Sequence, residues 1–217
     1  MRSRSVHDLS VLLSNLPELS SLTPGSFLRG MPIFSDVDPS VLERVAGTVE
    51  LCEYEPDEII ARYGKFNERF FLILSGRVGA VIPTEHDPRQ EIYTMSSGDF
   101  FGEGLVFSDE PRGNSAIARE PVTALAFSHE QLSVLTGASP DFRERLNRMY
   151  IDRKLRDTLR SLPLFTAMSG ELFERMLGMI EVITVPEDET VFREGDGGDT
   201  LYLIQKGEVR IYTGTGS

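Results

Sequence analysis

Residues 98–116 of the chain have the sequence GDFFGEGLVFSDEPRGNSA. Its glycines predict a turn that leads into a single turn of helix, and a second turn follows that carries Arg112. Gly102 and Gly104 allow the backbone to approach a ligand closely, and free N–H groups at the start of a short helix favour an anion. Arg112 suits a bidentate contact with phosphate oxygens, and Glu103, a pure acceptor, suits a sugar hydroxyl. The stretch therefore indicates a site that holds a phosphate at one end and a ribose at the other.

Short segments rich in β-branched and aromatic residues lie on both sides of this stretch, and they predict strands. Their residue ranges are 49–55, 58–62, 69–74, 77–83, 90–95, 115–119 and 122–127. Gly, Pro, Asn and Asp separate these segments, and no strand alternates with a long helix. The pattern predicts an antiparallel sandwich, barrel or jelly roll and argues against a doubly wound fold.

Helical periodicity marks three segments around these strands, namely residues 40–46, 129–135 and 140–161. In the longest of them a stripe of apolar residues is expected to pack against the core. The stripe consists of Phe142, Leu146, Met149, Tyr150, Leu155 and Leu159. Residues 6–19 near the N-terminus also have a helical pattern, which predicts either an interaction helix or a helix packed on the first domain.

The glycine-rich stretch also has the spacing of a known family. Phe101-Gly102-Glu103, followed by Pro111-Arg112 with Arg112 nine residues after Glu103, resembles the phosphate-binding cassette of cyclic nucleotide-binding domains. Residues 98–116 are therefore named the cassette. The resemblance to the family covers about residues 28–160. About residues 160–213 resemble the first half of the domain a second time. Further residues that carry it are Pro32, Phe34, Gly64, Phe70-Phe71-Leu72-Ile73, Gly76, Val78, Ser115 and Ala118-Arg119.

The resemblance implies an eight-stranded antiparallel jelly roll with flanking helices that binds cAMP or cGMP. It implies that Glu103 accepts the ribose 2′-hydroxyl and that Arg112 pairs with the cyclic phosphate. Backbone N–H groups would come from Gly102, Leu105 and Gly113, and Ser115 would lie near phosphate and base. The full set of expected ligand-binding residues is Phe101, Gly102, Glu103, Gly104, Leu105, Arg112, Gly113, Asn114 and Ser115. Gly104 stands where the family usually has an aliphatic residue, and Asn114 where a small apolar residue is common. Tyr150 and Met149 are candidates for covering the base.

The chain repeats itself at an offset of 131 residues. Phe34 matches Phe165, Gly64 matches Gly195 and Gly76 matches Gly207, without a gap. This register predicts an N-terminal helical segment (1–27), a first domain with closing helices (28–160) and an incomplete second copy (161–217). The second copy stops at the counterpart of His86, so the chain is expected to be part of a longer protein. We expect residues 163–217 to be poorly ordered or completed by another chain.

Composition narrows the classes of function. Acidic residues outnumber basic ones 34 to 22, for a net charge of -12, which argues against contact with duplex nucleic acid. The single cysteine, Cys52, cannot form a disulfide within the chain, and His7, His86 and His129 lack the spacing of metal ligands. No apolar run is long enough to span a bilayer. A cytoplasmic setting is expected, with no metal and no membrane contact.

The sequence thus favours a regulatory module that is not an enzyme and that binds a small cyclic nucleotide. Binding would move the C-terminal helix, and the effector, or a second copy in a homodimer, would lie outside the chain. One alternative is a structural jelly roll that binds no nucleotide. Another is the sensor part of a transcription regulator, which would require a helix-turn-helix beyond the residues present. A metal-dependent enzyme on a small barrel lacks its clustered ligands.

Overall fold

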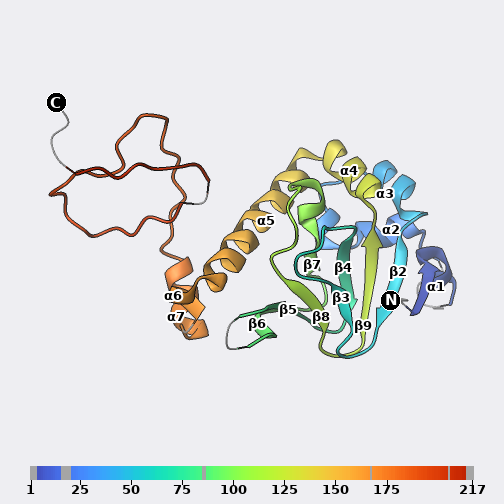
Figure 1. Cartoon of the computed structure of the whole chain (residues 1–217). Helices are drawn as coiled ribbons and strands as arrows, with labels where there is room; N and C mark the ends of the chain where they lie inside the picture. Colours follow the sequence, from blue (N-terminus) through green and yellow to red (C-terminus); the bar gives the residue numbers. More distant parts are fainter. Residues whose placement is uncertain (1–3, 16–20, 85–86, 167, 205, 214–217) are drawn as a thin grey trace. The chain divides into compact units, whose positions relative to one another are not determined.

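The computed structural model describes all residues except 1–3, 16–20, 85–86, 167, 205 and 214–217. It divides into two compact units, residues 1–173 and 174–217. The first unit holds a roll of antiparallel strands with helices beside it (Figure 1). Within the described residues, no helix combines the length and the apolar character that a membrane span requires.

Eight strands, β2 to β9, form two four-stranded layers with jelly-roll connectivity. One layer has the order β2-β9-β4-β7 and is extended beyond β2 by a fifth strand, β1 (Arg4–Asp8), and the other has the order β3-β8-β5-β6. Their bounds are β2 Glu50–Tyr54, β3 Ile59–Ala61, β4 Phe70–Ser75, β5 Val78–Ile82, β6 Gln90–Met95, β7 Phe100–Phe101, β8 Ser115–Ala118 and β9 Val122–Phe127. The predicted fold class is therefore confirmed, and every strand segment expected from the sequence is present.

Alternation along the strands explains how this roll forms two cores. In β4, Phe70 and Leu72 belong to the core that also contains helical residues, whereas Phe71 and Ile73 belong to a second core made of strand residues alone. Successive side chains of a strand point to opposite faces, so one strand serves both cores. β9 pairs with both β2 and β4, and Leu125 at its centre is fully buried.

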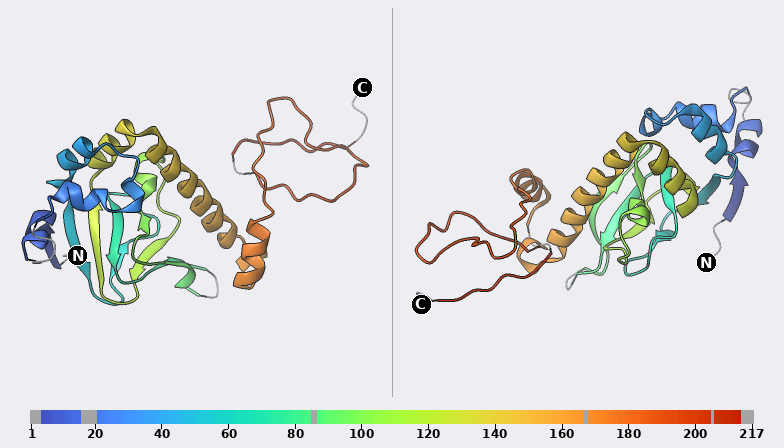
Figure 2. Two further views of the ribbon diagram at one scale, coloured as in Figure 1. Left: turned by 180° about the vertical axis from the view of Figure 1, so that it is seen from behind. Right: turned by 90° about the horizontal axis from the view of Figure 1, so that it is seen from above.

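Helices pack on one side of the roll (Figure 2). They are α2 Pro24–Arg29, a 3₁₀ turn at Pro32–Phe34, α3 Pro39–Ala46, α4 His129–Ala138 and α5 Pro140–Ser161. Capping residues mark the starts of two of these helices. Ser128 and Gln131 form a capping box at the start of α4. The Ser139 hydroxyl accepts a hydrogen bond from the N–H of Phe142 and so caps α5. In α5, Phe142, Leu146 and Leu159 are buried, as their helical spacing predicts.

The N-terminal segment differs from its predicted helix. Arg4–Asp8 forms a strand, β1, which pairs with the edge strand β2, and the helix α1 spans only Leu9–Asn15. The helical prediction over residues 6–19 is therefore wrong for 6–8, because pairing with an open sheet edge overrides a weak local preference. Residues 16–19 of that prediction lie outside the described residues.

Pro163–Thr166 forms the helix α6, and Gly170–Leu177 forms the helix α7. The expectation that residues 163–217 are poorly ordered or completed by another chain stays a prediction. From Gly178 to Thr213 the described residues form turns and bends but no helix or strand. Several backbone features nevertheless repeat at the offset of 131. The bounds of α7 match those of α3, and positive φ angles recur at Asp57 (66°) and Asp188 (64°). Two hydrogen bonds of turns recur as well. The Thr48 N–H donates to Val45 O (3.2 Å), and at the offset the Met179 N–H donates to Met176 O (2.9 Å). The Lys65 N–H donates to Arg62 O (3.3 Å), and at the offset the Asp196 N–H donates to Arg193 O (3.1 Å).

Candidate functional site

The backbone of the cassette makes a tight turn after the short strand β7. Gly102 has φ 91° and starts a single 3₁₀ turn, Glu103–Val106, so the predicted one-turn helix is confirmed. A Cβ atom on Gly102 would lie 2.3 Å from the carbonyl oxygen of Arg69. Only glycine fits this conformation beside this neighbour. The turn buries Glu103 in the wall of a pocket.

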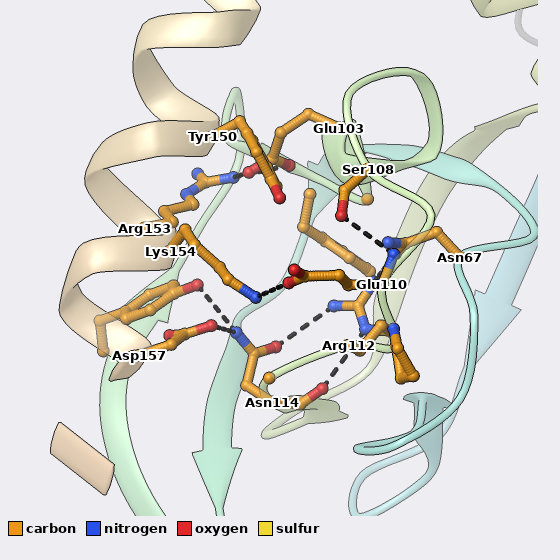
Figure 3. A pocket seen from close by; sticks show the side chains of 16 residues that line it. Asn67, Glu103, Ser108, Glu110, Arg112, Asn114, Tyr150, Arg153, Lys154 and Asp157 are labelled. Atoms are coloured by element: carbon orange, nitrogen blue, oxygen red, sulfur yellow. Dashed lines mark hydrogen bonds and ion pairs between the residues drawn. The ribbon is translucent and has the colours of Figure 1, made fainter. Parts of the chain in front are cut away.

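Arg112 lies across the same pocket and is fixed by its backbone and its side chain. Its N–H donates to Lys65 O (2.8 Å), and its carbonyl accepts from Gly64 N–H (2.9 Å). Its guanidinium donates from Nη1 to Asn67 Oδ1 (2.6 Å) and from Nη2 and Nε to the Asn114 side-chain and backbone oxygens (3.2 and 3.3 Å; Figure 3). Burial lowers the pKa of Arg112 from its ordinary value. All three acceptors are neutral amide oxygens, so they leave the charge of this cation uncompensated by direct contact.

Glu103 has the opposite arrangement, because a cation from α5 contacts it. Arg153 Nη1 lies 3.1 and 3.2 Å from the two carboxylate oxygens and donates to Phe100 O at 2.6 Å. Both charged side chains are largely buried. The ion pair keeps the carboxylate compensated, and each carboxylate oxygen retains further acceptor capacity for a hydroxyl.

Further side chains of α5 complete the wall. Lys154 Nζ donates to Glu110 Oε2 (2.6 Å), and this hydrogen bond lowers the pKa of Glu110. Asp157 Oδ2 accepts from Asn114 Nδ2 at 2.6 Å. Glu110 lies two residues before Arg112 in the sequence. Its negative charge is balanced by Lys154 of α5 and not by Arg112.

Most of the binding residues expected from the sequence line this pocket. Of the expected binding residues, the pocket is lined by Phe101, Gly102, Glu103, Gly104, Arg112, Gly113 and Asn114. Leu105 and Ser115 lie outside the lining. The Leu105 N–H donates to Gly102 O (3.0 Å), and the Ser115 hydroxyl accepts from Tyr63 N–H (2.9 Å). Their expected ligand contacts remain predictions.

Other lining residues were not found from the sequence. Asn67 and Tyr93 come from distant loops and strands, and Arg153, Lys154 and Asp157 come from α5, the helix that also carries Tyr150. Of the two candidates for covering the base, Tyr150 lines the pocket, whereas Met149 packs against the core. The α5 residues recur at i, i+3, i+4 and i+7, so they form one stripe of the helix, and this signal was present in the sequence.

Comparisons with known proteins point to one family. Residues 51–137 match the profile of the cyclic nucleotide-binding domain. The cGMP-dependent protein kinase 2 of Mus musculus is 27% identical over 158 residues, which cover 69% of this chain and 21% of that kinase. The cAMP-dependent protein kinase regulatory subunit of Blastocladiella emersonii is 23% identical over 125 residues, 58% of this chain and 31% of that protein.

A solved structure has the same fold. The regulatory subunit of a cAMP-independent protein kinase A from Trypanosoma brucei superimposes with a TM-score of 0.54 at 21% identity, over 67% of this chain and 53% of that one. The match to the mouse kinase spans about a fifth of that kinase's length. The chain therefore corresponds to only a part of the relatives that it matches.

Proposed function

We propose that this chain, whose residues 51–137 form a cyclic nucleotide-binding domain, is a non-catalytic regulatory module that binds cAMP or cGMP beside Arg112. The observation that carries the proposal is the guanidinium of Arg112, whose hydrogen-bond acceptors in the described part of the chain are amide oxygens alone. A partly buried cation without a contacting anion favours an anionic ligand, and a planar guanidinium matches the oxygens of a phosphate. Glu103 lines the same pocket and supplies an acceptor for the ribose 2′-hydroxyl.

The curated relatives support the regulatory part of this proposal. They are cyclic nucleotide-dependent kinases and a kinase regulatory subunit, and the matched residues form a nucleotide-binding domain. Binding would act on α5, because Arg153, Lys154 and Asp157 of this helix contact the cassette directly.

Titration calorimetry with cAMP and with cGMP, at two temperatures, tests the proposal. We expect one of them to bind with one site per chain. Arg112→Ala should weaken binding at least about 100-fold, because it removes charge-assisted hydrogen bonds to the phosphate. Arg77→Ala is the matched control, since Arg77 forms an exposed ion pair with Glu120 far from the pocket lining. Binding that survives Arg112→Ala would contradict the assigned phosphate position.

A structural roll that binds no nucleotide is the second candidate. One observation favours it: Glu103, Glu110 and Arg112 all have partners within the chain. A ligand would therefore have to replace or share contacts that already exist. Absence of heat with both nucleotides, for protein shown to be folded by circular dichroism, would support this candidate over the first.

We infer that residues 161–217 begin a second copy of the domain. The repeated sequence, the matching bounds of α3 and α7, and the recurring turns support this inference. The domains are then 1–27, 28–160 and 161–217. Residues 161–217 contain no counterpart of the cassette, so binding by this mechanism is assigned to residues 28–160. A stoichiometry of two nucleotides per chain would contradict that assignment.

A further inference from the structure

Asn114 connects the phosphate side of the pocket to α5. The residue is 7% exposed, and its side chain lies between the guanidinium of Arg112 and the carboxylate of Asp157 (Figure 3). Asn114 Nδ2 donates to Asp157 Oδ2 at 2.6 Å, and Asn114 Oδ1 accepts from Arg112 Nη2 at 3.2 Å. A continuous chain of hydrogen bonds thus runs from α5 to the cation of the cassette.

The chemistry of the two end groups fixes the orientation of this amide. A guanidinium only donates hydrogen bonds, and an ionised carboxylate only accepts them. The Asn114 amide satisfies both when its NH₂ faces Asp157 and its oxygen faces Arg112, which is the arrangement observed. Two acceptors face the NH₂ end of Asn114: the carboxylate of Asp157 at 2.6 Å and the hydroxyl of Tyr93 at 3.3 Å. Asp157 is the charged and shorter of the two, so it is the main anchor of this orientation.

A carboxylate at position 157 lowers the stability of the fold, which indicates that Asp157 has a role other than stabilisation. Its side chain is buried, with 9% exposed, and Oδ1 has no hydrogen-bond partner among the described residues. Burial raises its pKa to about 6, against the hydrogen bond from Asn114 and the charge of Arg112. A buried carboxylate with an unsatisfied oxygen costs stability. Its contact with Asn114 accounts for its presence at this place.

We propose that Asn114 is a positioning residue for the phosphate, anchored by Asp157 of α5, and that it couples the guanidinium of Arg112 to that helix. The proposal rests on the proposed function, because the ligand that Arg112 awaits is taken to be a cyclic phosphate. When phosphate oxygens engage the guanidinium, the Arg112–Asn114 contact is shared or lost. The Asn114–Asp157 bond then transmits that change to α5.

The test compares ligands with and without the phosphate on the same variants. Competition against a fluorescent cyclic nucleotide gives affinities for cAMP and cGMP and for adenosine and guanosine. Asn114→Ala should weaken the preferred cyclic nucleotide about tenfold and change the matching nucleoside less than about twofold, because the nucleoside has no phosphate for Arg112. Asn147→Ala is the matched control, since Asn147 lies on α5 outside the pocket lining.

A second variant tests the anchor. Asp157→Ala should produce the same selective loss, and the double variant should lose no more than Asn114→Ala alone, because both changes break one chain of contacts. Amide exchange of α5 in the wild type should change at saturating nucleotide. In Asn114→Ala, saturated at higher nucleotide concentration, that change should be absent or reduced.

The outcomes separate the two proposals. Equal losses for nucleotide and nucleoside would make Asn114 a purely structural residue and overturn the positioning role. Unchanged affinities in a wild type that binds would overturn it as well and leave the proposed function standing. A folded wild type that binds no cyclic nucleotide would overturn the proposed function and the positioning role with it.

Discussion

Residues 70–81 and 201–212 have the same apolar pattern, and yet their side chains have opposite exposure. Ile73 is 1% exposed, and its counterpart Ile204 is 58% exposed. Val78 is fully buried, and Val209 is 51% exposed. In the first stretch the residues form β4 and β5, whereas in the second the described residues form no strand. The same apolar pattern is therefore folded into buried strands in residues 70–81 and left without strands and exposed in the described residues of 201–212.

The features that the two regions share are local, and the features that they do not share are long-range. The turn at Asp57 recurs at Asp188, because a turn is set by residues a few positions apart. Strands β2 to β5 instead pair with β8 and β9, at residues 115–127. The sequence contains no counterparts of β8 and β9 at the same offset. Strand formation thus depends on partners that the second region does not have within this chain.

The most direct way to break this comparison is to truncate the same side chain in both regions. Ile73→Ala should lower the free energy of unfolding of the first unit by about 3 to 4 kcal/mol, because it leaves a cavity between the two sheets. Ile204→Ala should change it by less than about 0.5 kcal/mol, since an exposed side chain loses little burial. Urea denaturation followed by far-ultraviolet circular dichroism measures both. A loss above about 1 kcal/mol for Ile204→Ala would mean that Ile204 is covered in solution.

The buried carboxylate of Asp157 gives the next largest expected effect. Its pKa is about 6 in the folded protein against an ordinary value of 3.8, so the folded state binds the extra proton. Stability should therefore fall as pH rises from about 4 to about 6 and stay low above that. The charged groups that act on it are Arg112, Glu103 and Arg153, and Asn114 donates to it.

Asp157→Asn removes this titration and keeps an acceptor oxygen for Asn114. Its free energy of unfolding, relative to the wild type, should rise by about 2 to 3 kcal/mol across the same pH interval. Denaturation curves at pH 4, 5, 6 and 7 provide the difference. Asp188→Asn is the control in the second region, since Asp188 is exposed, and its curve should follow the wild type. A pH-independent difference for Asp157→Asn would show that its carboxyl titrates normally.

The sequence predicted the parts of the fold that local pattern controls. The bounds of β6 and β9 agree with the predicted segments 90–95 and 122–127. The strand β7 was missed, because two residues carry no alternation and Phe101 becomes a strand only by pairing with Phe71. β1 was missed for the same reason, since its state depends on the edge of β2.

The residues of the site also fall into those that a local sequence pattern predicts and those that only long-range packing brings together. Gly102, Glu103 and Arg112 lie close in sequence and were found from their spacing. Asn67 reaches Arg112 across 45 residues, and Arg153 reaches Glu103 across 50. No local pattern contains such contacts, because they follow from the way α5 and the loop before β4 pack on the cassette.

The smallest expected effect tests the feature that the two regions share. Asp57 has φ 66° and is exposed, so Asp57→Gly should relieve about 1 kcal/mol of left-handed strain. Greater freedom of glycine in the unfolded chain offsets part of this gain, which leaves about 0.5 kcal/mol of added stability. Asp188→Gly, at φ 64°, relieves the same strain in a turn outside the first unit. It should therefore leave the denaturation midpoint of the first unit unchanged, because no strand pairing depends on that turn. If Asp188→Gly shifted the midpoint as much as Asp57→Gly, the second turn would contribute to a folded sheet, and the difference between the two regions would not exist in solution.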